Sequence, residues 1–211
     1  MLLEIVIWPV NVKFIITLAA TLLLSSTLAA TVTKLEGSIP GYKRDPSLLV
    51  LGGRGSVLSS TQIGADGKFS LNLPAVDAKR LGSINTFFKS CAVKPTVTPA
   101  DGTWLNIISL PVSDGKRVFA ALSLDSVSKK AKAGDVWVSW VYSAKPVELV
   151  GSSTCVGKRS KTSVSSAWTV KLETGWNLLS RTVNTVDATG IKTTYAAVSS
   201  FPVNATWKLA R

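Results

Sequence analysis

Histidine is absent from the 211-residue sequence, which also holds only one methionine and two cysteines. Because histidine is the commonest general base and the commonest metal ligand, its absence removes both from the candidate chemistry. Acidic residues are scarce as well: 12 Asp and Glu stand against 24 Lys and Arg, so the formal net charge is +12 at pH 7. The composition therefore disfavours a histidine-dependent enzyme and favours association with polyanions.

Recognisable catalytic motifs of other kinds are also missing. The Ser-x-x-Lys spacing of Ser126 and Lys129 has no Ser-Asp-Asn or Lys-Thr-Gly companion. The glycine-rich run 51–56 lacks the Gly-Lys-Ser/Thr ending of a phosphate-binding loop, and we interpret it as a bulged strand. Five of the aspartates stand beside or near glycines, where turn geometry favours them, and no Asp-x-Asp-x-Asp spacing supports a calcium loop. We therefore expect no enzymatic activity, no cofactor and no metal.

One short apolar run lies near the N-terminus. Residues 14–24 carry no charge, follow Lys13 and precede a stretch of small residues. These are the three parts of a secretory signal, and a helix of this length, rising about 1.5 Å per residue, covers only half of a membrane core of roughly 30 Å. We predict a signal peptide at residues 1–30, cleaved after Ala29 or Ala30, with a retained anchor as the alternative.

Residues 1–11 differ from the rest of this signal, because Glu4 is acidic and Pro9 interrupts the helix. We interpret them as an extension that precedes a start at Val12. Export implies a secreted, periplasmic or cell-envelope protein that would contact the membrane only through an uncleaved signal segment. In an oxidising compartment we expect Cys91 and Cys155 to form a disulfide, with two separate buried thiols as the alternative.

The remaining residues, 31–211, show strand signals every eight to twelve residues, separated by Gly, Pro, Asp and Ser clusters. This spacing predicts an all-β fold: an antiparallel β-sandwich with short helical turns near 76–81 and 127–133, preceded by the signal helix. The expected strands lie at 47–51, 55–63, 68–74, 104–110, 117–124, 135–142, 167–173, 178–183, 192–199 and 206–209.

Two hairpins and one central strand are predicted within this set. Ala65-Asp66-Gly67 and Gly175-Trp176-Asn177 are each turn signals between two such strands, so each predicts a hairpin. Residues 135–142 are apolar on both faces, which is typical of a central strand. Two prolines and a glycine indicate an internal seam at 94–102, and a bridge between the cysteines on its two sides would make 31–211 a single domain.

The basic residues occur as scattered pairs rather than in one long run. The pairs are Lys43-Arg44, Lys79-Arg80, Lys116-Arg117, Lys129-Lys130, and Lys158-Arg159 with Lys161 nearby. We take Lys158, Arg159 and Lys161 as candidate contacts for a polyanion, with an ordinary solvated surface as the alternative interpretation. Because the protein is expected to work outside the cytoplasm, its expected partners are anionic envelope polymers or polysaccharides rather than nucleic acid.

Six tryptophans follow the predicted signal, and most of them are expected to pack in the core. Trp137 and Trp176 are the two least committed to an inward face. Because aromatic rings stack on sugar rings, these two are candidate platforms for carbohydrate.

The run 66–74, Asp-Gly-Lys-Phe-Ser-Leu-Asn-Leu-Pro, resembles the hairpin of transthyretin-like and carboxypeptidase-regulatory-like β modules. With its two cysteines and the Gly175-Trp176-Asn177 corner, the rest of the chain resembles exported β-sandwich proteins of bacterial envelopes. That resemblance brings no known activity with it. We therefore expect an exported, non-enzymatic protein that associates with the envelope. The alternatives are a carbohydrate-binding module and a carboxylate-dependent hydrolase.

Overall fold

The computed structural model of the protein describes residues 32–44, 47–53, 56–127, 130–157 and 162–210. Regular structure in these residues is almost entirely β, which confirms the predicted all-β class. Its two helical turns are η1 (Ala78–Arg80) and α1 (Ile84–Phe87), and no helix among the described residues is long and apolar enough to span a membrane. The predicted signal peptide at 1–30 lies outside the described residues.

Fifteen strands follow one another along the described chain. They are β1 (Lys34–Ser38), β2 (Ser47–Gly53), β3 (Ser56–Ile63), β4 (Lys68–Asn72), β5 (Gly82–Ser83), β6 (Thr96–Thr98), β7 (Thr103–Ile107), β8 (Leu110–Ser113), β9 (Val118–Asp125), β10 (Val136–Ser143), β11 (Val147–Val156), β12 (Ser163–Leu172), β13 (Gly175–Asp187), β14 (Gly190–Val198) and β15 (Thr206–Ala210). The helical turn predicted at 76–81 contains η1, whereas the described residues of 127–133 form no helix.

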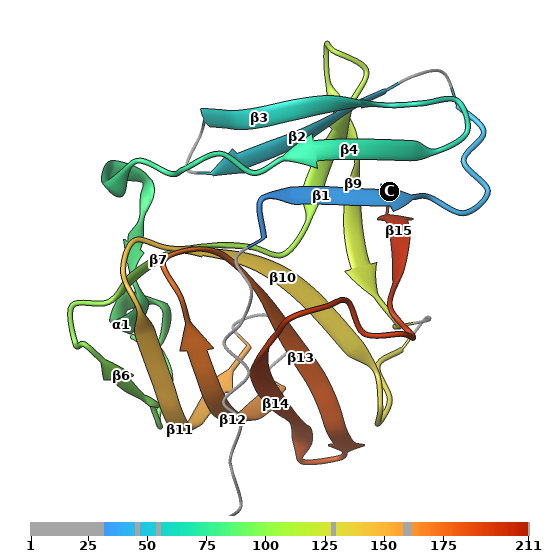
Figure 1. Ribbon diagram of the computed structural model, residues 1–211. Helices are drawn as coiled ribbons and strands as arrows, with labels where there is room; N and C mark the ends of the chain where they lie inside the picture. The colour runs from blue at the N-terminus through green and yellow to red at the C-terminus, as the bar shows by residue number, and fades with distance from the viewer. Residues whose placement is uncertain (1–31, 45–46, 54–55, 128–129, 158–161, 211) are drawn as a thin grey trace, which may run out of the picture.

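The strands form one sheet of thirteen and a second sheet made of β1 and β4. The main path of the large sheet runs β3-β2-β8-β9-β10-β13-β14-β12-β11-β6, with β15 added to β9, β7 to β10 and β5 to β7. Figure 1 shows β1 to β4 gathered above a strongly curved lower set that includes β10, β13, β14, β12 and β11. The pairings are antiparallel except for β12 with β14, so the prediction of an antiparallel sheet is wrong at that one pair.

Both predicted hairpins are wrong in their pairing, although the chain turns where expected. Asp66 Oδ1 accepts a hydrogen bond from the Lys68 backbone N–H at 3.0 Å, but β4 pairs with β1 while β3 pairs with β2. At the second corner, β14 lies between β12 and β13 and separates them. Turn residues decide where a chain reverses, whereas packing against other strands decides which partner each strand takes.

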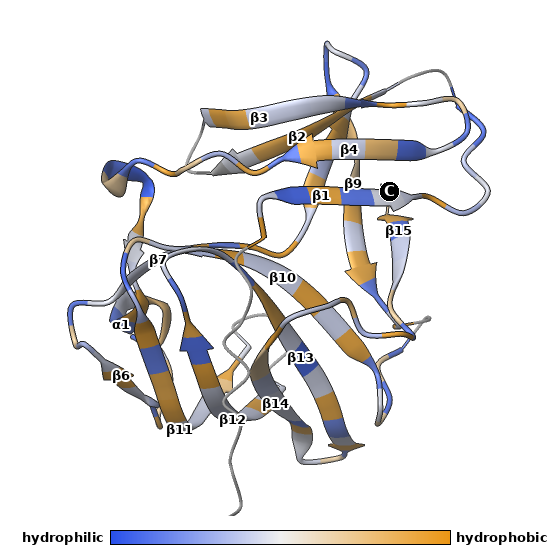
Figure 2. Ribbon diagram, viewed as in Figure 1, coloured by the Kyte–Doolittle hydropathy of each residue, from blue (hydrophilic) through white to orange (hydrophobic). Residues whose placement is uncertain are grey.

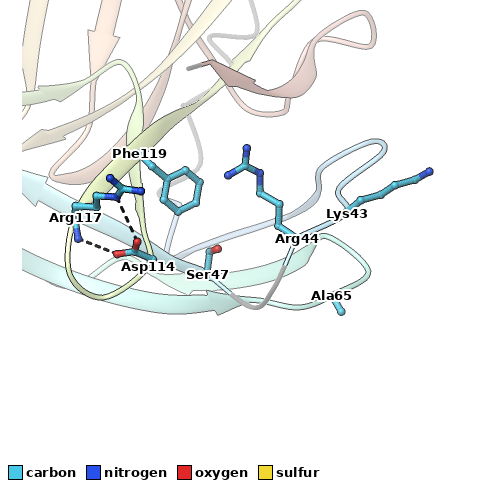
Figure 3. A pocket seen from close by; sticks show the side chains of 7 residues that line it. All are labelled: Lys43, Arg44, Ser47, Ala65, Asp114, Arg117 and Phe119. Carbon is cyan, nitrogen blue, oxygen red and sulfur yellow. Dashed lines mark hydrogen bonds and ion pairs between the residues drawn. The ribbon is translucent and has the colours of Figure 1, made fainter.

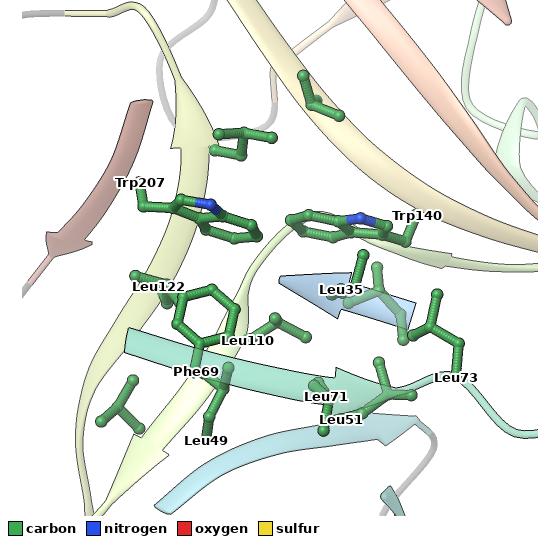
Figure 4. Close-up of a cluster of buried hydrophobic side chains, with 14 of the residues drawn as sticks. Leu35, Leu49, Leu51, Phe69, Leu71, Leu73, Leu110, Leu122, Trp140 and Trp207 are labelled. Atoms are coloured by element: carbon green, nitrogen blue, oxygen red, sulfur yellow. The ribbon is translucent and has the colours of Figure 1, made fainter. Parts of the chain in front are cut away.

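Two hydrophobic cores meet at β10. Val136, Val138 and Trp140 pack in the first core with the leucines of β2 and β4, whereas Val141 packs in the second core against β11 and β12. Figure 2 shows the apolar bands along these strands, and Figure 4 shows Trp140 and Trp207 above the leucines of the first core. β10 is therefore covered on both faces, which confirms the predicted central strand.

Cys91 and Cys155 form the predicted disulfide, which joins residues 64 positions apart. In the chain-entropy model a closed loop of this length stabilises the fold by about 4 kcal/mol. The segment predicted as a seam, 94–102, contains β6, which pairs with β11 and buries Val97 in the second core. This segment therefore belongs to the second core.

Candidate functional site

An open pocket of about 640 Å³ lies beside the turn that joins β8 to β9. Its lining comes from three parts of the chain: the segment before β2 with the first residue of β2, the turn before β4, and the β8–β9 turn with the start of β9. The lining residues are Lys43, Arg44, Ser47, Ala65, Asp114, Arg117 and Phe119. Three of these seven side chains are cationic and one is acidic, so the described lining has an excess of positive charge.

The β8–β9 turn holds Arg117 at the edge of this pocket. Asp114 Oδ1 accepts hydrogen bonds from the backbone N–H groups of Lys116 and Arg117, both at 2.9 Å, and Gly115 supplies the positive φ of 87° that the turn requires. These backbone hydrogen bonds, led by that of Arg117, lower the pKa of Asp114 from its ordinary value. Among the described lining residues, Asp114 is the only carboxylate, and it is engaged by its own turn and by an ion pair with Arg117 Nε at 3.7 Å.

An aromatic ring lies between the two arginines of the pocket. The Arg44 guanidinium lies over the Phe119 ring, 4.9 Å from its centroid. In Figure 3 Phe119 is seen between Arg117 and Arg44, while Lys43 extends away from them. A guanidinium is planar and carries five N–H donors, so it is suited to carboxylate and phosphate groups. The chemistry of this arrangement therefore suits an anionic group.

Sequence reasoning noticed the cations of this pocket but did not bring them together. The pairs Lys43-Arg44 and Lys116-Arg117 are separated in the chain by seven strands, β2 to β8, and each places at least one member in the same pocket. The available signal was the Asp-Gly-Lys-Arg turn at 114–117, which fixes an arginine next to a tight turn. The cations predicted as contacts, Lys158, Arg159 and Lys161, lie outside the described residues.

Trp176, a candidate carbohydrate platform because it was less committed to an inward face, lies in the core instead. The residue is only 3% exposed, and its Nε1 donates a hydrogen bond to the Pro74 carbonyl at 2.7 Å. The reason is that β13 already begins at Gly175, so Trp176 lies within a strand paired with β10 and points into the first core.

Trp137 is half-buried and belongs to a row of side chains that crosses four strands. In register, Trp137 on β10 is followed by Arg181 on β13, Tyr195 on β14 and Trp168 on β12. The Arg181 guanidinium lies 4.9 Å from the Trp137 ring centroid and 5.8 Å from that of Tyr195, which stacks on Trp168 at 3.9 Å. One face of the Trp137 ring is therefore occupied by Arg181, and the row stabilises the sheet.

Within the described part of the chain, no cluster of three or more Asp, Glu or Cys residues is arranged to hold a metal ion. Comparison with known proteins returns no match: no family model, no curated protein and no solved structure matches the chain.

Proposed function

We propose that this chain is an exported, non-enzymatic β protein that binds anionic polymers of the cell envelope at the pocket between Arg44 and Arg117. The observation that carries the proposal is the convergence of three cations on one open pocket, in which the one carboxylate among the described lining residues is held by its own turn. An anionic group entering the pocket meets the Arg44 guanidinium over the Phe119 ring. It also meets the Arg117 guanidinium, whose Nε lies 3.7 Å from Asp114 Oδ2 while the side chain as a whole stays exposed.

Export is supported by two independent features. The apolar run 14–24 has the organisation of a secretory signal, and the disulfide between Cys91 and Cys155 is of a kind that persists in oxidising compartments. The positive charge is retained after signal removal, because 23 of the 24 basic and 11 of the 12 acidic residues lie beyond Ala30. A protein of this charge outside the cytoplasm meets anionic envelope polymers as its most abundant polyanions.

A polymer is favoured over a small anion because the cations are exposed. The Arg117 side chain is 82% exposed, so a single ion pair with it contributes well under about 1 kcal/mol. Useful affinity then requires several such contacts along one chain, which a repeating polyanion supplies. It follows that binding weakens as salt screens the charges.

The test compares two double variants on columns of immobilised polyglycerol phosphate and polygalacturonate. Arg44→Gln with Arg117→Gln removes the pocket cations, and Lys79→Gln with Lys192→Gln removes two exposed cations elsewhere, so both variants have the same net charge. We expect the pocket variant to bind about tenfold more weakly at low salt and to elute earlier. Co-elution of the two variants would show that net charge alone governs retention and would overturn the pocket assignment.

Location is tested separately. Fractionation of cells that express the full chain should recover the protein outside the cytoplasm in a form cut near Ala30. Recovery of the uncut chain from the cytoplasm alone contradicts the export part of the proposal.

A further inference from the structure

A second cleft, of about 610 Å³, opens along β7 and is bordered by α1. One edge of β7 pairs with β10 along Trp104 to Ile107. Among the described strands, the other edge pairs only with β5, at Thr103 and Trp104. Along this second edge, the rest of β7, from Leu105 to Ile107, therefore has no described strand beside it and lines the cleft.

The lining of this cleft differs in chemistry from that of the basic pocket. Its described lining contains no charged side chain: neutral hydrogen-bonding groups from Ser83, Thr86, Asn106 and Ser109 alternate with aromatic and aliphatic surface. A charged ligand would find no counter-charge among these residues. The combination of hydroxyls, an amide and aromatic carbon matches a neutral ligand that carries many hydroxyl groups on an apolar ring.

Phe87 supplies a fixed aromatic surface at this cleft. Its side chain is 49% exposed, yet its ring meets Phe88 edge-on at 5.0 Å and Trp104 at 5.3 Å between centroids. Phe88 and Trp104 are themselves 1% and 5% exposed, so they anchor the exposed ring in the second core. A ring held in this way loses little conformational freedom when a ligand stacks on it.

Asn106, which also lines this cleft, carries a polar atom without a partner. Its Oδ1 has no hydrogen-bond partner among the described residues and no contact with solvent. Rotation of the amide about its terminal torsion, which is broad for asparagine, would turn that oxygen towards a ligand hydroxyl. A ligand that donates hydrogen bonds would thus satisfy an acceptor that the protein leaves unsatisfied.

From these observations we infer that the cleft between α1 and β7 binds a neutral carbohydrate, with a sugar ring on Phe87 and its hydroxyls on Asn106 and Thr86. The volume is within the range of small-molecule sites and accommodates one or two sugar rings. The open edge of β7 also suits an extended peptide, but four neutral hydrogen-bonding side chains around an exposed ring favour sugar. The site goes beyond the proposed polyanion pocket and shares no residue with it.

The experiment titrates the full chain with neutral oligosaccharides, a β-glucan pentaose and a chitin pentaose, and follows the total tryptophan fluorescence and the heat of binding. We expect saturable binding to at least one of them that is unchanged between 50 and 500 mM salt. Phe87→Ala should weaken it more than tenfold and Asn106→Ala about fivefold. Phe201→Ala, which removes another exposed ring outside the cleft, should change it less than twofold.

Two further measurements keep the outcome decisive. Phe87→Tyr keeps an aromatic ring at this position and should bind sugar as the unchanged protein does. If Phe87→Tyr binds as weakly as Phe87→Ala, or if Phe87→Ala is unfolded, the loss of binding reflects structural damage and the assignment is overturned. Absence of binding to both sugars also overturns it, and capture of an extended peptide by β7 would replace it with strand addition. Neither result bears on the polyanion pocket, which is tested by salt-dependent retention and by different residues.

Discussion

At the scale of single residues, Asn177 holds the corner between β12 and β13. Its buried amide donates to the carbonyls of Glu173 and Gly175, both at 2.9 Å, and its Oδ1 accepts from the Glu173 N–H at 2.9 Å. One side chain thus satisfies three backbone groups that the corner takes out of regular pairing. An aspartate there could not donate to either carbonyl, so the amide itself is required.

We expect Asn177→Ala to lower the free energy of unfolding by about 3 kcal/mol, because the three backbone groups lose their partner in a place with little water. Urea denaturation measures the change. Asn184→Ala is the matched control: the Asn184 amide bonds the Thr194 hydroxyl at an exposed position, and its loss should cost less than about 1 kcal/mol. Equal losses in the two variants would show that the corner does not depend on this amide.

At the scale of elements, β1 approaches β15 more closely than any side chain would permit. A Cβ built on Gly37 lies 2.1 Å from Nε1 of Trp207 and 2.6 Å from its Cδ1. The indole cannot give way, because it is parallel to Trp140 at 5.5 Å and meets Phe69 edge-on at 4.9 Å. The missing side chain of Gly37 therefore sets the distance at which β1 covers the first core.

Gly37→Ala should destabilise the protein by about 3 kcal/mol through this overpacking. Ser38→Ala, at an exposed position of the same strand, should change stability by less than about 0.5 kcal/mol. If the collision with Trp207 is the cause, Gly37→Ala should cost less stability when Trp207 is also replaced by Phe. Thermal unfolding of the unchanged protein, the two single variants and the double variant measures this coupling. If the stability losses of the two substitutions simply add, the collision with Trp207 is not the cause.

The elements that sequence reasoning found are those whose signal is local. β10 was predicted from its two apolar faces, and the alternation in β12 correctly placed Trp168, Val170 and Leu172 inward. β11 was missed because Gly151-Ser152-Ser153 interrupts its pattern, and it becomes a strand through its pairing with β12 and β6. The pairing of the strands was missed because it is not a local property. The insertion of β14 between β12 and β13 depends on residues far apart in the chain.

The candidate sites show the same limit. The basic pocket gathers cations from separate segments, and the cleft beside β7 depends on a strand edge that no neighbour covers. Neither arrangement has a local signature. By contrast, Cys91 and Cys155 were predicted correctly because only one pairing exists for two cysteines.

At the scale of the whole molecule, the absence of histidine shapes the response to pH. Several exposed carboxyl groups have a lowered pKa, among them Asp66, mainly through the Lys68 backbone N–H, and Asp187, mainly through the Thr189 hydroxyl. A carboxyl group whose pKa is lower in the folded state stabilises it above the unfolded value, and this contribution is lost as pH falls through the folded value. Burial raises the pKa of the Tyr195 hydroxyl, so its contribution is present below about pH 10 and lost above.

We therefore expect the thermal midpoint to stay constant between about pH 5 and pH 9, to fall below about pH 4, and to fall again above about pH 10. Retention by anionic polymer should likewise be constant across the middle range, because the guanidinium groups of Arg44 and Arg117 stay charged throughout it. A transition centred near pH 6 in either measurement would contradict this account.

The late position of β14 in the chain fixes when the protein is able to fold. β14 lies between β12 and β13 although it is synthesised after both, and β15, which follows it, brings Trp207 into the first core. A nascent chain therefore has no finished core until its last strands have left the ribosome. For a polypeptide that is threaded through a membrane channel before it folds, as proposed here for this one, this delay is useful, because a core that closed early would jam the channel. Under the export proposed here, the strand order leaves the two cores incomplete until β14 and β15 have been synthesised.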